Sequence, residues 1–240
     1  EVLRFLNVWI QTIFSPLVSS LLFLLVLSLA IGSERGEILG VPFIIFLAPG
    51  LIAMQVIQQA FSHSSSSFMI GKIQGNIVDL LYAPLSASEV TISISLAAVT
   101  RSFLIAAVST LVFYIIIDIQ IKHFFSLILF TFLSSFILGN LGIAAGLWAE
   151  KFDHMATVTN FVIVPLSFLS GTFYSIDRLP SILKNISEYN PFFYMIDGFR
   201  YSFIGNADGS IRFGIIYLII LSFLSWLAVF ILFKKGYKIK

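Results

Sequence analysis

The stretch "LLFLLVLSLAI" at residues 21–31 is almost entirely apolar and does not alternate between apolar and polar side chains. Strands of a transmembrane β-barrel alternate in this way over about 10 residues, whereas a helix that crosses a bilayer needs about 20 predominantly apolar residues. The run begins near Pro16 and reaches Ile31 without a charged residue. It therefore predicts a membrane-spanning helix at about 14–31 and, with it, an all-α polytopic membrane protein.

The composition of the whole chain supports this class. Of the 240 residues, 58% are hydrophobic and 11% are charged, and the mean hydropathy is +1.01. A soluble domain carries about 25% charged residues, so most of this surface is expected to face lipid. The formal net charge of +2 gives no strong basic field for a nucleic-acid partner. The absence of cysteine excludes disulfides, thiol catalysis and thiolate metal sites.

Five further apolar runs complete a pattern of six spans in a single transmembrane domain over 1–240. We expect these spans at approximately 41–61, 90–117, 124–148, 155–170 and 211–233. The fifth apolar run, 155–169, has 15 residues and would cover about 22 Å, less than the hydrocarbon core of about 30 Å. Residues 1–13 mix apolar and polar positions and include Trp9, which predicts an N-terminal helix at the membrane surface.

Residues 68–83 predict a short amphipathic helix between the second and third spans. Pro84 ends this helix, and "SASE" at 86–89 forms a capping box for the next one. The apolar positions recur with helical spacing and alternate with polar ones. They are Ile70, Ile73, Ile77 and Leu80, with Lys72, Gln74, Asn76 and Asp79 between them.

Residues 171–210, after the short fifth span, predict two re-entrant half-helices. Pro180 can begin the first, and Asn190 followed by Pro191 is a typical start for the second. Irregular backbone at membrane depth is tolerated only where protein or a watery cavity covers it. Asp197 and Arg200 stand at positions i and i+3, and we expect them to pair on the polar side of the second half-helix.

The orientation follows from the C-terminal tail. Six spans place both termini on one side, and four of the last seven residues are lysines. Positive charge accumulates on the cytoplasmic side of membrane proteins. Both termini and residues 68–83 are therefore expected in the cytoplasm, and residues 171–210 are expected to face outward.

Four segments resemble the ABC-2-type transporter permeases, the membrane subunits of bacterial ABC exporters. The segments appear in that family's order and together cover most of the chain. They are "FLAPGLIAMQ" at 46–55, "GNIVDLLYAPLSASE" at 75–89, "SFLSGTFYSIDRLP" at 167–180 and "NPFFYMIDGFR" at 190–200. The third looks most like permeases paired with a separate ATPase, which include nodulation-factor, drug and polysaccharide exporters.

The resemblance implies a partner ATPase and a location in the bacterial inner membrane. No G-x-x-x-x-G-K-[ST] motif occurs in the chain, so the ATPase would be another polypeptide. Two ATPases would bind two permeases, as a homodimer. The permease itself would not be catalytic, and ATP and Mg²⁺ would bind to the partner, which leaves this chain without a cofactor.

The resemblance also assigns roles to residues at both ends of the bundle. Segment 68–83 would be the coupling helix that contacts the ATPase, although it could also be a simple connector on the lipid surface. Its candidate contact residues are Lys72, Gln74, Ile77, Asp79 and Pro84. The candidates for the pathway or outer gate are Arg101, Phe173, Tyr174, Asp197 and Arg200.

Several of these residues have other interpretations. Arg101 could extend to the cytoplasmic interface, or serve the pathway or a subunit contact. Asp197 and Arg200 could be structural. Gly139, Gly142 and Gly146 share one face of the fourth span and predict helix packing.

Two other classes of function remain as alternatives. An ion-coupled secondary transporter normally has ionisable residues near the midplane, and Arg101 is the one candidate in the spans. An intramembrane enzyme would need a cluster of catalytic side chains. His63, His123 and His154 are far apart in the sequence and match no metal motif.

For the exporter that the resemblance implies, we expect export of an amphipathic, lipid-linked, polysaccharide or drug-like cargo.

Overall fold

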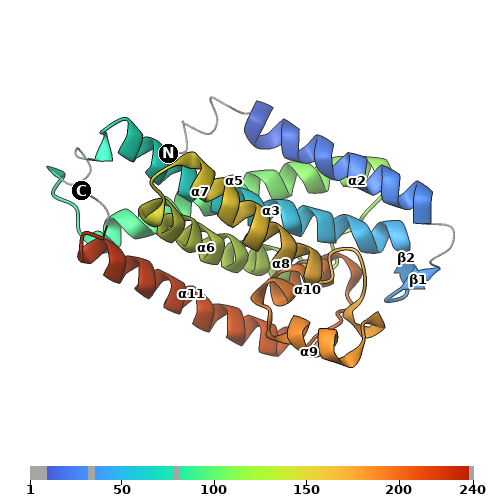
Figure 1. Ribbon diagram of the computed structural model, residues 1–240. Coiled ribbons are helices and arrows are strands. Elements are labelled where there is room, and N and C mark those ends of the chain that lie inside the picture. The colour runs from blue at the N-terminus through green and yellow to red at the C-terminus, as the bar shows by residue number, and fades with distance from the viewer. Residues whose placement is uncertain (1–9, 32–35, 78–81, 238–240) are drawn as a thin grey trace.

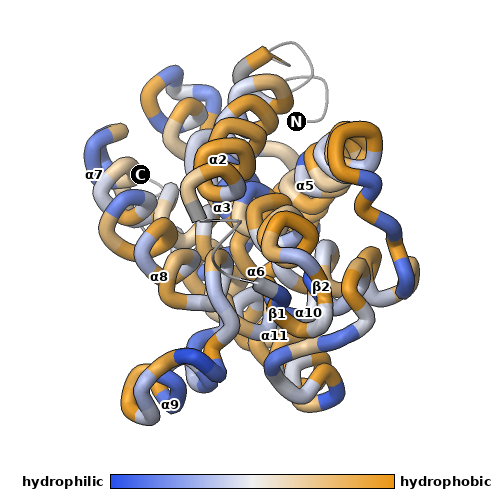
Figure 2. The backbone as a smooth tube through the Cα atoms, turned by 90° about the vertical axis from the view of Figure 1, so that its right-hand side faces the viewer, coloured by the Kyte–Doolittle hydropathy of each residue, from blue (hydrophilic) through white to orange (hydrophobic). Residues whose placement is uncertain are grey.

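The computed structural model describes residues 10–31, 36–77 and 82–237, and its helices run along one long axis (Figure 1). Within these residues, six helices are long and apolar enough to cross a membrane. In Figure 2, which colours the backbone by hydropathy, the long helices are mostly hydrophobic and the hydrophilic residues gather mainly in the connecting segments. The fold class is the all-α polytopic membrane protein that the sequence predicts.

The elements follow one another in an up-and-down order. A π-helical turn, η1 (Ile10–Phe14), leads into α2 (Ser15–Ile31), and a small antiparallel hairpin precedes α3. The hairpin and the next three helices are β1 (Glu37–Ile38), β2 (Val41–Pro42), α3 (Phe43–Ile73), α5 (Ala87–Ile117) and α6 (Phe124–Trp148). The remaining elements are α7 (Phe152–Val158), η2 (Thr159–Ile163), α8 (Val164–Leu169), η3 (Ile176–Arg178), α9 (Ser181–Tyr189), α10 (Pro191–Ile204) and α11 (Ile211–Lys234).

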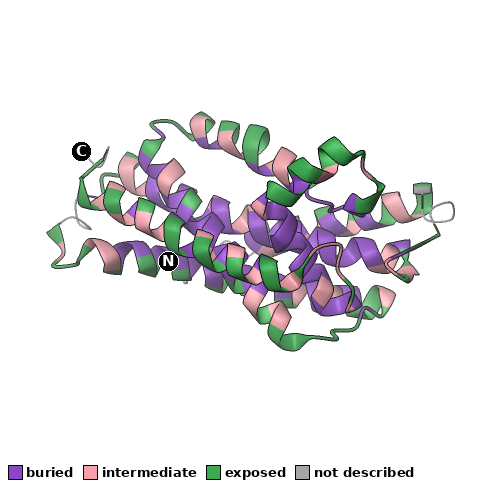
Figure 3. Cartoon of the chain, turned by 90° about the horizontal axis from the view of Figure 1, so that it is seen from below, coloured by how far each residue is buried: buried purple, intermediate pink, exposed green. Residues whose placement is uncertain are grey.

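Helix α3 is the centre of the bundle and contacts α2, α5, α6 and α10. Most of its residues are buried, and seen from below the buried residues concentrate along the middle of the molecule (Figure 3). The three glycines of α6 provide the close packing. A Cβ atom on Gly142 would lie 2.5 Å from the backbone oxygen of Phe61, and one on Gly146 would lie 2.8 Å from Cβ of Phe68. The packing role predicted for these glycines is confirmed.

Helix α3 also corrects the interpretation of residues 68–83. It has 31 residues, a length of about 46 Å, and it includes residues 68–73. The predicted separate helix is therefore wrong at its beginning, and Asp79 lies outside the described residues. Serine-rich stretches such as 62–67 often mark a helix end, but the hydroxyls of Ser65 and Ser66 donate to carbonyls of their own helix. These bonds satisfy the serines without ending it.

The fifth span is longer than its apolar run indicated. Residues 152–169 form one helical stretch of 18 residues, about 27 Å long. Its middle, Thr159–Ile163, is π-helical. Pro165, two residues after this stretch, has no N–H to donate, so the hydrogen-bond register changes around it.

The start of α5 agrees with the predicted capping box. The hydroxyl of Ser86 accepts a hydrogen bond from the backbone N–H of Glu89 at 3.3 Å. The carboxylate of Glu89 accepts one from the backbone N–H of Ser86 at 2.7 Å. Two backbone groups at the start of the helix are thereby satisfied.

The packing of α6 on α3 generates a test with a matched control. The change Gly142→Ala should destabilise the protein by about 1–3 kcal/mol, because the backbone of α3 leaves no room for a methyl group. The change Gly71→Ala introduces the same methyl group into α3 where no atom lies within 4 Å, and it should be neutral or stabilising by up to about 1 kcal/mol. Thermal unfolding in detergent measures both. Equal effects of the two changes would contradict the close packing.

Candidate functional site

The segment expected to face outward, residues 171–210, is called here the outer segment and lies at the same end of the bundle as the β1–β2 hairpin (Figure 1). Its main element is α10, which packs against α3, α6 and α11. The side chain of Asn190 caps the start of α10 by accepting from the N–H of Phe192 at 3.1 Å. At the other end, Lys122 Nζ donates to the carbonyl of Ile204 at 2.6 Å. Both ends of this half-helix are therefore fixed by neighbouring segments.

The burial of α10 is more complete than the sequence predicts. The expected apolar face is buried and comprises Phe192, Met195, Ile196, Phe199 and Phe203. The expected polar side is not exposed, because Asp197 is 2% exposed and Arg200 is 0% exposed. The two charges therefore lie inside the protein in this conformation and not on an exposed polar side of α10.

Asp197 holds the loop that follows α10. Its carboxylate accepts hydrogen bonds from the backbone N–H groups of Asp208, at 3.0 Å, and Gly209, at 2.9 Å. The carboxylate of Asp208 in turn accepts from the hydroxyl of Ser175 at 2.5 Å and from the N–H of Ile176 at 3.3 Å. Asp197 thus fixes a loop that itself fixes the chain after the fifth span.

Arg200 holds the outer turn, which we define as residues 170–175. Its Nη2 donates to the carbonyl of Gly171 at 2.6 Å and is 3.3 Å from that of Thr172. The guanidinium carbon lies 3.9 Å from the centre of the Phe46 ring, a cation–π contact. Among the described residues, no acceptor bonds to Nε or Nη1 of Arg200.

Asp197 and Arg200 do not form the predicted ion pair. Both belong to the described part of the chain, and no distance of 4.0 Å or less joins a nitrogen of Arg200 to an oxygen of Asp197. Their spacing allows contact, but backbone groups from the outer turn and from the 208–209 loop bind them instead. The pairing hypothesis is wrong for this conformation.

The two aromatic candidates of the outer turn are half-buried. The ring of Phe173 lies 6.3 Å from that of Phe23 on α2 and 5.3 Å from that of Phe168 on α8. Tyr174 packs against the central core, and burial raises the pKa of its hydroxyl above the ordinary value. Phe173 therefore connects the outer turn to two helices that the charged residues do not reach.

Arg101 lies in the middle of α5 and binds α3. Its guanidinium donates to the side-chain oxygen of Gln59 and lies 3.5 Å from Nδ1 of His63. The side chain therefore turns toward the neighbouring helix and does not extend to the cytoplasmic interface. The sequence analysis missed Gln59 as a partner, although a glutamine within an apolar span is the signal that could have found it.

A second polar contact inside the bundle was also missed. Asn140 on α6 accepts from Ser95 on α5 at 2.8 Å and donates to Ser225 on α11 at 3.3 Å. One amide therefore joins three helices. A single asparagine in the fourth apolar run was the available signal.

At the end of the bundle that is expected to be cytoplasmic, Lys72 is directed into the protein. Its Nζ donates to the carbonyls of Gly146, at 2.9 Å, and Ala149, at 3.2 Å, and also to that of Leu147. A lysine in this position satisfies terminal carbonyls of α6 and interacts favourably with the helix dipole. Lys72 therefore caps α6, and its ammonium group is directed toward these carbonyls and not toward a partner ATPase.

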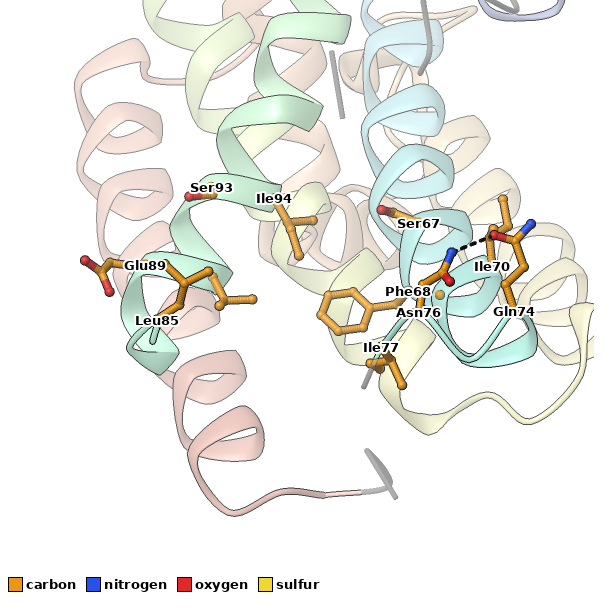
Figure 4. Close-up of a pocket in the computed structure, with 12 residues that line it drawn as sticks. Ser67, Phe68, Ile70, Gln74, Asn76, Ile77, Leu85, Glu89, Ser93 and Ile94 are labelled. Atoms are coloured by element: carbon orange, nitrogen blue, oxygen red, sulfur yellow. Dashed lines mark hydrogen bonds between the residues drawn. The ribbon is translucent and has the colours of Figure 1, made fainter. Parts of the chain in front are cut away.

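The other cytoplasmic candidates surround a cavity of about 450 Å³ between the end of α3 and the start of α5 (Figure 4). Gln74 and Pro84 are exposed, whereas Ile77 is buried. The apolar wall of the cavity is Phe68, Ile77, Val90 and Ile94. Glu89 and Ser93 on α5 lie across from Gln74 and Asn76, which are joined by a hydrogen bond of 3.1 Å. This end therefore combines exposed polar groups with an apolar wall.

The contacts of the outer turn predict different effects for two aspartates. The change Asp208→Ala removes the acceptor for Ser175 and Ile176 and should cost about 1–3 kcal/mol. The change Asp177→Ala removes the pair with Lys184, which has an N···O distance of 2.6 Å but exposed side chains, and should cost at most about 1 kcal/mol. Thermal unfolding in detergent compares them. A larger effect at Asp177 would contradict this organisation of the turn.

Comparisons with known proteins agree with this architecture. The sequence profile of the family described as ABC-2 type transporter matches residues 1–204 and so ends with the last residue of α10. The inner membrane transport permease YadH of Escherichia coli strain K12 is 32% identical over 238 residues, 98% of this chain and 92% of that protein. Nodulation protein J of Rhizobium leguminosarum biovar viciae is 24% identical over 212 residues, 84% of this chain and 78% of that protein. Six apolar helices, the enclosed half-helix and these relatives together identify a multi-pass permease of the inner membrane, and the chain belongs to the ABC-2 type transporter family.

Proposed function

We propose that this chain is the permease through which a separate ATPase drives the export of an amphipathic cargo. Membership of the ABC-2 type transporter family supports a membrane subunit of an ABC transporter. The observation that carries the proposal is the arrangement of side chains where α3 ends and α5 begins. Exposed polar groups there surround an apolar wall, and several of these residues belong to segment 68–83, which is predicted to contact the ATPase.

The proposed assembly has two copies of this chain and two copies of the ATPase. ATP and Mg²⁺ bind to the ATPase, and the permease supplies no catalytic group. Closure of the ATPase dimer on ATP moves the cytoplasmic ends of the permeases and reshapes a path between them. The energy available for this movement is the difference in ATP affinity between the two conformations.

An apolar groove supports an amphipathic cargo. It has a volume of about 750 Å³ and lies between α5, α6 and the turn that joins them. Its lining includes Phe103, Leu111, Phe124 and Leu127, and Gln120 lies at the end of these helices that is near the outer segment. A groove of this kind can hold an acyl or isoprenoid chain while a polar headgroup remains at the membrane boundary.

An ion-coupled secondary transporter receives less support. Arg101 binds the amide of Gln59 and lies against the imidazole of His63, both on α3. Ion coupling normally uses ionisable residues along a proton or ion pathway. The family membership favours ATP as the energy source.

The proposed orientation can be tested with single cysteines, because the chain has none of its own. Asn185→Cys and Asn206→Cys, both exposed in the outer segment, should react with a membrane-impermeant maleimide in intact cells. Glu150→Cys, exposed in the turn between α6 and α7, should react only after the membrane is opened. Labelling is read from a gel shift. Reaction at Glu150→Cys alone in intact cells would reverse the orientation.

The proposed coupling can be tested by affinity purification from the native membrane. The tagged chain should co-purify with a protein that carries the G-x-x-x-x-G-K-[ST] motif. The change Ile77→Asp should reduce its recovery about tenfold or more, because a charge on this apolar wall would displace the segment and cost over 1.4 kcal/mol of binding. The control Phe152→Asp, at the exposed start of α7, should leave the recovery unchanged. Normal recovery of the ATPase with Ile77→Asp would mean that segment 68–83 is only a connector.

A further inference from the structure

Helix α3 connects the two ends of the molecule without interruption. Phe46 and Gly50, near its start, contact Arg200 and the outer turn. Lys72, near its end, is bound to the carbonyls that end α6. The 31 residues between Phe43 and Ile73 form one α-helix. A displacement at the cytoplasmic end of α3 therefore reaches the outer segment through a single continuous element.

Arg200 joins three separate parts of the chain at the outer end of α3. It belongs to α10, it donates to the carbonyls of the outer turn, and its guanidinium stacks on the ring of Phe46. The side chain is fully buried, and its Nε and Nη1 have no acceptor among the described residues. Within the described part of the chain, the carbonyls of Gly171 and Thr172 are therefore the acceptors that bind this guanidinium. Removing them would leave a buried cation without an acceptor, which is strongly unfavourable.

Gly50 makes this three-way contact possible. A Cβ atom at Gly50 would lie 2.6 Å from the carbonyl oxygen of Thr172 and 2.9 Å from Nη2 of Arg200. Any side chain at this position would push the outer turn away from α3. The glycine thus lets the backbone of the outer turn approach the backbone of α3 directly.

We infer that the outer turn, α10 and the continuous helix α3 form one rigid unit, called here the outer unit, which moves as a body during transport. Arg200 is its positioning residue. Opening of the outer side moves the whole unit against its neighbours, and the outer turn does not detach from α3. The unit does not include α9, whose apolar residues Ile182 and Ile186 are exposed. The movement itself rests on the proposed transport function, whereas the rigidity does not.

The test is a distance measurement between two spin labels. One label replaces Ile73, at the cytoplasmic end of α3, and the other replaces Asp177, directly after the outer turn, and both positions are exposed. Labelled chains are diluted with unlabelled ones in nanodiscs, so that each assembly carries one pair. In the parent protein the distance distribution should be narrow. With the partner ATPase present, trapping with ATP should change it by no more than about 2 Å, a small helix shift.

Two changes should loosen the outer unit by independent routes. Arg200→Met removes the charge but keeps much of the side-chain volume, and Gly50→Ala displaces the carbonyl of Thr172 while keeping the charge. Each should broaden the distribution even without nucleotide, and Arg200→Lys should restore part of the narrow distribution. The matched control is Lys122→Met, which removes another cation–carbonyl bond, at the far end of α10, and should leave the distribution narrow.

The possible outcomes distinguish the rigidity of the outer unit from the proposed transport function. A narrow distribution in both Arg200→Met and Gly50→Ala would overturn the inference, and so would a large shift on ATP trapping in the parent protein. If no ATPase binds the chain, the proposed function fails, while the measurements without nucleotide still decide whether the outer unit is rigid. If Arg200→Met does not fold, Gly50→Ala and Arg200→Lys decide the question.

Discussion

A charge inside a helical membrane bundle must be bound by the protein itself, because water is not there to solvate it. In this permease the buried or half-buried charges bind neutral groups. Arg200 binds backbone carbonyls, Asp197 binds backbone N–H groups, and Arg101 binds an amide. Each of these partners belongs to another segment of the chain. The charges therefore fix the positions of the segments between helices, where apolar packing alone has little directional preference.

The sequence predicts most of the elements because lipid imposes a simple rule on them. Apolar runs of sufficient length must be helices, so the fourth run at 124–148 has the same bounds as α6, and the last differs from α11 by one residue. Helical periodicity also predicts the buried face of α10, including Phe192 and Phe199. Short polar signals at helix ends, such as Asn190 and the 86–89 capping box, act within a few residues and can be read directly.

The candidate site was less predictable because its contacts join residues that are distant in the sequence. The spacing of Asp197 and Arg200 shows only that they could meet. It gives no sign that the carbonyl of Gly171, 29 residues away, would bind the arginine instead. The serines at 62–67 are a second case of contacts that the local sequence does not reveal. Polar residues usually mark a helix end, but Ser65 and Ser66 bond within α3, and Ser64 packs closely against Gly142 of α6, far away in the sequence.

The way the charges are bound also bears on how a transporter of this kind could use ATP. Nucleotide binding can shift a conformational equilibrium only by the difference in affinity between the two states. If the outer turn had to leave Arg200 in every cycle, part of that difference would be spent on exposing a buried cation, at a cost of several kcal/mol. A turn that stays bound to α10 and α3 avoids this cost. The surfaces between the outer unit and its neighbours then change, and they include apolar contacts such as that between Phe130 of α6 and Gly198 of α10. Apolar surfaces can slide past one another without leaving an unpaired charge, so movement across such contacts is energetically easier than movement within the outer unit.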